Sequence, residues 1–157
     1  MTGANLPIIG FLSGLCLVAS WLDMRRREIP NWLCMITAIS GLAISTYQGG
    51  LVLAGSHGLH AVISLAGGLV LFALELVGGG DAKFYAAVAT WFSLRSLMAL
   101  LTSVTSCGLV LLFFWFIARR VAGKPVRRRG KDPFDSLPYG IAISAGAVLL
   151  AAMIGGE

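Results

Sequence analysis

The run LMALLTSVTSCGLVLLFFWFIA, residues 97–118, contains no charged side chain. A helix needs about 20 mainly apolar residues to cross the hydrocarbon core of a bilayer, so this run is long enough. Composition extends the argument to the whole chain. Hydrophobic residues make up 57% of the sequence and charged residues only 12%, whereas a soluble domain carries about 25% charged residues. The sequence therefore predicts an integral membrane protein.

Five further apolar runs are separated by charged or glycine-rich segments. They cover residues 6–22, 32–47, 57–77, 84–94 and 137–154. The run at 84–94 is the shortest, and we expect its helix to be short, tilted or partly re-entrant. The pattern predicts an all-α, polytopic membrane protein with about six transmembrane helices, in a single domain over residues 1–157.

The positions of lysine and arginine predict the orientation, because cytoplasmic loops accumulate these residues. Residues 25–27, Lys83 and the basic segment 119–131 fall in loops that six crossings place on one side of the membrane. Of the 12 basic residues, only Arg95 falls on the other side. We therefore expect the basic side to be the cytoplasm and both termini to lie outside. The net charge of +5 then fits anionic lipid head groups better than nucleic acid.

Acidic side chains near the ends of predicted helices are candidates for function, because a carboxylate at bilayer depth costs about 3 kcal/mol. Asp23 follows the first apolar run and Asp81 follows the third. Between these residues the chain crosses the membrane twice, in the second and third predicted helices. Asp23 and Asp81 therefore lie at the same face, where their carboxyl groups could meet. Two carboxyl groups that share one proton can activate water and polarise a peptide carbonyl. The alternative is that both are ordinary loop acids beside Arg25 and Lys83.

Two features near Asp81 add to the hypothesis of a site. Residues 78–80 are consecutive glycines, which can adopt positive φ and permit another chain to approach closely. Such backbone suits an extended peptide bound across the site, although a flexible turn would have the same composition. Glu75 is expected within the third helix near its cytoplasmic end, as a structural hydrogen-bonding group or a substrate contact.

Three motifs resemble those of the prepilin peptidases, which belong to the GxGD aspartyl proteases. GGGDAK at 78–83 is similar to the family's GxGDxK motif, and DMRRREIPN at 23–31 resembles its first aspartate motif, D-x-R-x-x-x-I-P-N. PYGIA at 138–142 resembles the P-Y-G-x-A segment that opens the last helix. The motifs occur in the family's order and extend over nearly the whole chain.

The resemblance implies a bacterial inner-membrane endopeptidase, and the orientation predicted from the basic residues then places both termini in the periplasm. Its substrates would be type IV prepilins, cut on the cytoplasmic side between a basic leader and a hydrophobic segment. Beyond these precursors and the lipid bilayer, its partners would be other pilus-assembly proteins. No cofactor or metal is implied. The residues that the resemblance assigns are the catalytic pair Asp23 and Asp81 and the supporting residues Gly78, Gly80, Lys83 and Asn31.

The sequence departs from the larger, bifunctional members of that family. Those members carry a cytoplasmic segment with paired CxxC motifs and also methylate the new N-terminus. The three cysteines here, Cys16, Cys34 and Cys107, lie singly in apolar runs and are expected to be small buried side chains. The chain therefore resembles the short, peptidase-only enzymes of Flp (tight-adherence) pilus systems, without a separate methyltransferase or zinc-binding segment.

Other classes of function remain open at this point. A small transporter subunit could use Asp23 and Asp81 to relay protons or bind a cation, although its acids would be expected nearer the bilayer midplane. A non-catalytic subunit of a secretion machine would tolerate the loss of both acids. His57 and His60, three residues apart, could bind a metal. Because they are predicted far from the aspartates, we expect them to be polar residues at the membrane interface.

Overall fold

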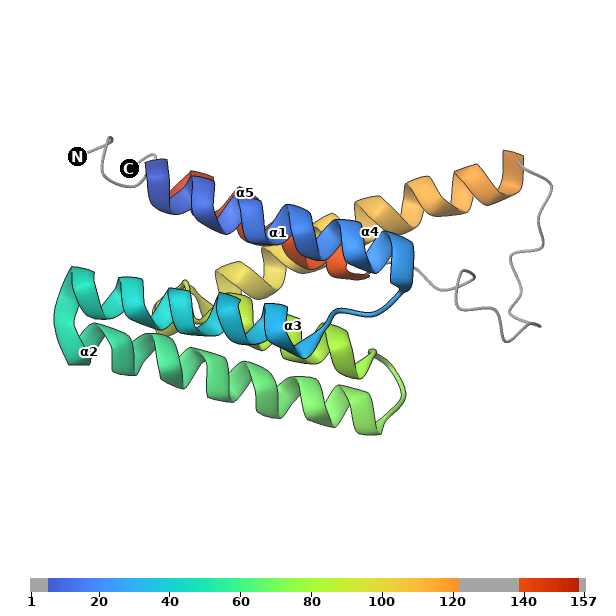
Figure 1. Cartoon of the computed structure of the whole chain (residues 1–157). Coiled ribbons are helices and arrows are strands. Elements are labelled where there is room, and N and C mark those ends of the chain that lie inside the picture. Colours follow the sequence, from blue (N-terminus) through green and yellow to red (C-terminus); the bar gives the residue numbers. More distant parts are fainter. Residues whose placement is uncertain (1–5, 122–138, 156–157) are drawn as a thin grey trace.

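The computed structural model describes residues 6–121 and 139–155, and within these ranges the protein is helical (Figure 1). The prediction of an all-α protein is confirmed. Most of the basic segment 119–131 and Pro138 of the third motif lie outside the described residues. The elements are α1 (Leu6–Arg26), α2 (Asn31–Ala73), α3 (Gly79–Ala89), the 3-10 helix η1 (Leu94–Ser96), α4 (Leu97–Val121) and α5 (Tyr139–Gly155).

Helix α2 consists of two limbs that fold back on each other (Figure 1). The reversal occurs at Gly49 and Gly50, where φ is −146° and 67°. The positive φ at Gly50 is accessible mainly to glycine, which explains the residue type at this turn. The limbs correspond to the predicted runs 32–47 and 57–77. The second limb differs from its prediction, since it follows Gly50 directly and ends at Ala73.

The helices have the length and surface of a membrane protein. Three of them, α1, α2 and the stretch Leu94–Val121, are long and apolar enough to cross a bilayer, and Tyr139–Ile154 is apolar but shorter. Large apolar side chains point outward along α4, where Leu109, Phe113 and Phe114 are all more than half exposed. A soluble monomer rarely exposes so large an apolar surface. The six crossings and the location of the termini stay predictions.

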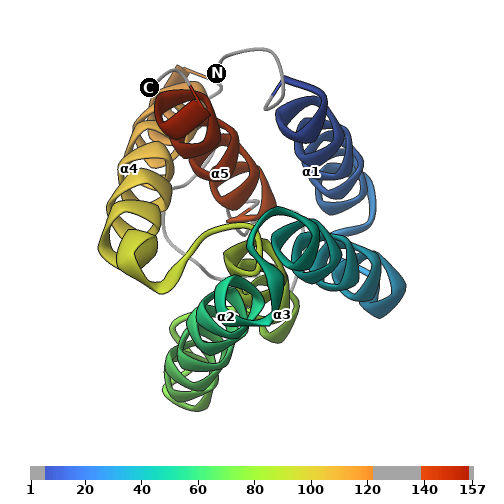
Figure 2. The ribbon, with the colours of Figure 1, turned by 90° about the vertical axis from the view of Figure 1, so that its left-hand side faces the viewer.

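The helices form two groups (Figure 2). In the first group α5 packs against both α1 and α4, and in the second α3 packs against α2. Small residues bring the backbones together in each group. A Cβ atom at Gly146 of α5 would lie 2.6 Å from Cα of Val104 in α4, and one at Gly68 of α2 would lie 2.9 Å from Cβ of Ala82 in α3. Close approach of this kind is typical of helix packing in membranes.

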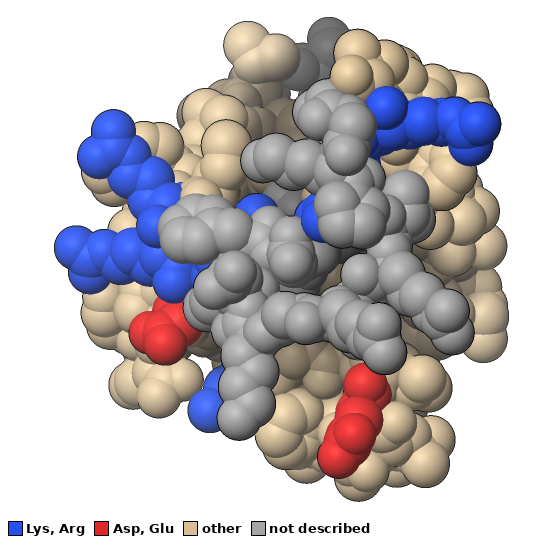
Figure 3. All heavy atoms as spheres, turned by 90° about the vertical axis from the view of Figure 1, so that its right-hand side faces the viewer, with Lys and Arg blue, Asp and Glu red and all other residues tan. Residues whose placement is uncertain are grey.

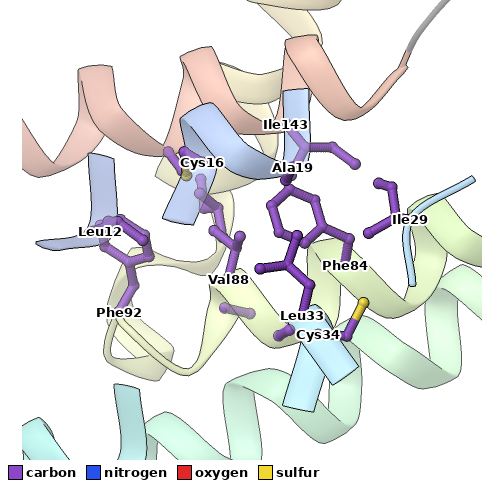
Figure 4. Packing of buried hydrophobic residues seen from close by; sticks show 14 of the residues in the cluster. Leu12, Cys16, Ala19, Ile29, Leu33, Cys34, Phe84, Val88, Phe92 and Ile143 are labelled. Atoms are coloured by element: carbon purple, nitrogen blue, oxygen red, sulfur yellow. The ribbon is translucent and has the colours of Figure 1, made fainter. Parts of the chain in front are cut away.

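Helix α3 is short and lies at the centre of the core (Figure 4). Its Phe84 and Val88 are fully buried, among Leu12 of α1, Leu33 of α2 and Ile143 of α5. Eleven residues give a helix about 16 Å long, roughly half the thickness of the hydrocarbon core. The prediction of a short fourth helix is therefore confirmed, although it extends over residues 79–89 rather than 84–94.

His57 and His60, predicted to be polar residues at the membrane interface, are buried inside the protein, and their depth in the membrane stays a prediction. Nδ1 of His57 lies 2.8 Å from the carbonyl oxygen of Thr90, and Nδ1 of His60 lies 3.0 Å from that of Phe92. A carbonyl oxygen only accepts, so each Nδ1 carries the proton. The histidines thus bond to carbonyl groups that the end of α3 leaves without helical partners. Among the described residues, no cluster of three or more metal-ligating side chains occurs.

We predict that Gly146→Ala destabilises the protein by about 1–3 kcal/mol, because its Cβ would overlap the backbone of Val104 and force α4 and α5 apart. Thermal unfolding in detergent, followed by reaction of a dye with the buried thiols of Cys16 and Cys34, measures this effect. Gly14→Ala in α1 is the matched control, since a Cβ atom there meets nothing within 4 Å. Equal melting temperatures for the two variants would contradict the packing argument.

Candidate active site

Asp23 lies in the last turn of α1, and its side chain is only 6% exposed. Arg27, with a φ of 56°, follows directly after the end of the helix. A carboxylate is unfavourable at a helix C-terminus, where the carbonyl ends of the peptide dipoles point. The structure compensates from a second helix, because the backbone N–H of Gly140 donates a hydrogen bond of 2.9 Å to Oδ2 of Asp23. Gly140 lies in the first turn of α5, where free N–H groups favour an anion.

Asp81 lies in the first turn of α3, directly after the glycine run. The expectation that this run uses positive φ is not confirmed: φ at Gly78 is −69°, and among the described glycines only Gly50 has a positive φ. The glycines provide space instead. A Cβ atom at Gly78 would lie 2.8 Å from Oδ2 of Asp81, and one at Gly80 would lie 3.7 Å from the backbone nitrogen of Ile29.

The two carboxyl groups influence each other electrostatically. Burial, and to a lesser extent the nearby carboxylate of Asp23, raises the pKa of Asp81 from 3.8 to about 6. Neighbouring like charges disfavour double ionisation, so such a pair tends to hold one proton. The structure therefore brings together the two acids that the topology was expected to bring together.

Both carboxyl groups line a cavity of about 1070 Å³ at one end of the molecule. This end carries the α1–α2 and α2–α3 connections (Figure 1), and Figure 3 shows Lys and Arg side chains around its edge. Every residue that the sequence singled out for the site lies on the cavity wall. The wall includes Asp23, Arg26, Arg27, Glu28, Asn31, Glu75, Gly78, Gly79, Gly80, Asp81, Lys83, Trp115, Arg119 and Tyr139.

Two of the predicted supporting residues contact each other. Nζ of Lys83, on α3, donates a hydrogen bond of 3.3 Å to Oδ1 of Asn31 at the start of α2. This bond joins the segments that carry the first and second aspartate motifs. It ties α3 to the first turn of α2 at the edge of the cavity.

Glu75 differs from its prediction. Helix α2 ends at Ala73, and Glu75 follows in an exposed turn with a φ of 58°. It is therefore outside the helix, on the rim of the cavity. A non-glycine residue with positive φ is uncommon, because the side chain crowds the backbone in that conformation.

Gly140 is the contact that the sequence reasoning did not assign to the site. A Cβ atom at this position would lie 2.8 Å from Oδ2 of Asp23 and 3.0 Å from its Cβ and Cγ. The signal was present in the motif PYGIA, which contains Gly140, but the motif alone does not show that α5 packs beside α1. Only the fold reveals that this glycine amide bonds to the first aspartate.

We predict that Asp81→Asn stabilises the protein at alkaline pH. The pKa of Asp81 is raised in the folded protein, so the stability that its protonated form contributes is present below about pH 4 and is lost as the pH rises through about 6. The neutral amide avoids this loss, and the variant should be more stable than the wild type at about pH 8, on the order of 1 kcal/mol.

The measurement is a series of thermal unfolding curves in detergent across this pH range. Glu28→Gln is the control, because it removes an exposed acid from the same cavity wall. A stability gain for Asp81→Asn that does not vary with pH would contradict a buried, titrating carboxyl group.

Comparison with known proteins gives one match. The model of the type IV leader peptidase family matches residues 10–121, a range that includes both Asp23 and Asp81. No curated protein and no solved structure gives a significant match. The family match covers more than half of the chain and confirms the resemblance found in the motifs. This membrane protein belongs to the type IV leader peptidase family.

Proposed function

We propose that the protein is an aspartyl endopeptidase of the bacterial inner membrane that removes the basic leader from type IV or Flp-type prepilins. The observation that carries the proposal is the pair Asp23 and Asp81, which come from separate helices and line one cavity. Burial raises the pKa of Asp81, and the charge of Asp23 adds to this shift, as expected of two carboxyl groups that share a proton. The predicted orientation puts this cavity on the cytoplasmic face.

The hydrogen bonds of the pair suggest a division of roles. The Gly140 amide donates to Oδ2 of Asp23 and so stabilises its carboxylate form. Burial and the neighbouring carboxylate raise the pKa of Asp81 to about 6, which favours its protonated form. In this scheme Asp23 takes a proton from the attacking water while Asp81 donates a hydrogen bond to the scissile carbonyl oxygen. The tetrahedral intermediate then collapses, and the leaving nitrogen receives a proton from the pair.

The supporting roles follow from the same contacts. Gly78 leaves the Asp81 carboxyl group room to face the cavity, and the bond from Lys83 to Asn31 ties α3 to the first turn of α2. Glu75 is an exposed acid on the rim, suited to a basic side chain of the leader. The reaction as proposed needs no metal or cofactor.

We predict that Asp23→Asn and Asp81→Asn each abolish cleavage, because an amide can neither take up the proton of water nor share one with its partner. Each variant is co-expressed with a tagged Flp-type prepilin, and cleavage is measured as a gel shift of the pilin. Glu28→Gln, an exposed acid on the same wall, is the control for loss of a nearby negative charge.

The same experiment distinguishes the other classes of function. Wild-type cleavage in Asp81→Asn, with equal protein in the membrane, would overturn the aspartyl mechanism. No cleavage of several precursors by the wild type would favour a transporter subunit or a non-catalytic assembly subunit.

We predict that Gly140→Ala lowers the rate of cleavage at least tenfold. Its Cβ would come within about 3 Å of three atoms of Asp23 and displace the carboxyl group that the Gly140 amide holds. A displacement of about 1 Å in a catalytic group reduces the rate by about 100-fold. The control is Gly14→Ala, which adds the same methyl group to a helix in open space. Equal rates in the two variants would contradict the role of Gly140.

A further inference from the structure

A second hollow lies on the outside of the molecule, between the two limbs of α2 and helix α3. It has a volume of about 520 Å³. The side chains along it are short or apolar, and they include Met35, Ala38, Ala61, Val62, Leu65 and Ala86. Met35 and Val62 are 61% and 64% exposed, so the hollow opens onto the surroundings of the helices. We refer to it as the α2–α3 groove.

The α2–α3 groove begins where the catalytic cavity ends. Asn31 and Lys83 line both hollows, and their hydrogen bond stands at the boundary. Beyond Lys83, the groove residues Ala86, Ala87 and Thr90 follow at helical spacing along one face of α3. The groove therefore extends about 10 Å along α3 from Lys83, away from Asp81.

We propose that the α2–α3 groove binds the hydrophobic segment of the precursor as a helix while the leader occupies the catalytic cavity. The inference rests on the proposed function, in which the scissile bond separates a basic leader from an apolar segment. With that bond at the aspartates, the two sides of the substrate need adjoining polar and apolar surfaces. The cavity and the groove are adjoining surfaces of these two kinds.

The residue types in the groove fit a helix as the occupant. Lipid chains are as apolar as a leucine side chain, so helix association in a membrane depends on close van der Waals packing rather than on the hydrophobic effect. The groove has an alanine on each of its three sides: Ala38 on the first limb of α2, Ala61 on the second limb and Ala86 on α3. No large side chain projects into the groove from these positions. Small side chains of this kind allow the backbone of a second helix to approach closely.

Photocrosslinking tests the position of the bound segment. A benzophenone amino acid replaces Val62 in the groove or Leu109 on α4, two apolar positions with similar exposure, 64% and 62%. Each variant is co-expressed with the tagged precursor. We expect a crosslink from position 62 to the hydrophobic segment and none above background from position 109. Equal crosslinking from both positions, or crosslinking from 109 alone, would overturn the proposal.

Kinetics separates the groove from the chemistry. Val62→Trp partly fills the groove, and Leu109→Trp is its matched control. We expect Val62→Trp to raise KM for the full precursor about tenfold and to leave unchanged the cleavage of a peptide that carries the leader and scissile bond but no hydrophobic segment.

The outcomes also distinguish this inference from the proposed function. Equal KM values for the two tryptophan variants, or equal losses on both substrates, would refute the groove while leaving the peptidase intact. Absence of cleavage by the wild-type protein would instead count against the proposed function on which the groove depends.

Discussion

A helix of eleven residues leaves as much of its backbone without helical partners as a long one does, and at the C-terminal end of α3 the residues that carry those groups are buried inside the protein. Buried N–H and C=O groups need hydrogen bonds. At the far end of α3, His57 and His60 supply donors to the carbonyl groups of Thr90 and Phe92, and Ser56 accepts from the N–H of Leu94. These bonds fix where α3 ends. Because the helix is rigid, they also contribute to the position of Asp81 in its first turn.

The site is divided between the two groups of helices. Asp23 belongs to α1 and is held by Gly140 of α5, whereas Asp81 belongs to α3, which packs against α2. The alignment of the carboxyl groups thus depends on the apolar interface around Phe84 that joins the groups. Glycine leaves room for the carboxyl group on both sides, since a Cβ atom at either Gly78 or Gly140 would lie 2.8 Å from a carboxylate oxygen.

The sequence was sufficient for the helical class and for the motif residues that line the cavity, because apolar runs and motifs are local features. It was insufficient where a residue's role depends on a distant segment. The hydrogen bonds of the histidines were not predicted, because nothing nearby in the sequence shows that α3 stops at Ala89 and that the carbonyl groups of Thr90 and Phe92 lie beside them. Glu75 was assigned to a helix because its apolar neighbours continue past Ala73, where the backbone turns. The bond from Gly140 to Asp23 spans 117 positions, beyond any spacing argument.

The division of the site has a pharmacological consequence. An inhibitor that bonds to both carboxyl groups at once would link the two helix groups, because each group holds one of the two aspartates. Its binding free energy would then add to the cohesion of the whole fold, as for any ligand that binds only the folded state. A compound that contacts one aspartate alone would add only the binding free energy of its contacts with one helix group. Thermal stabilisation in a ligand screen follows affinity for the folded protein, so it would favour compounds that gain affinity from both aspartates at once.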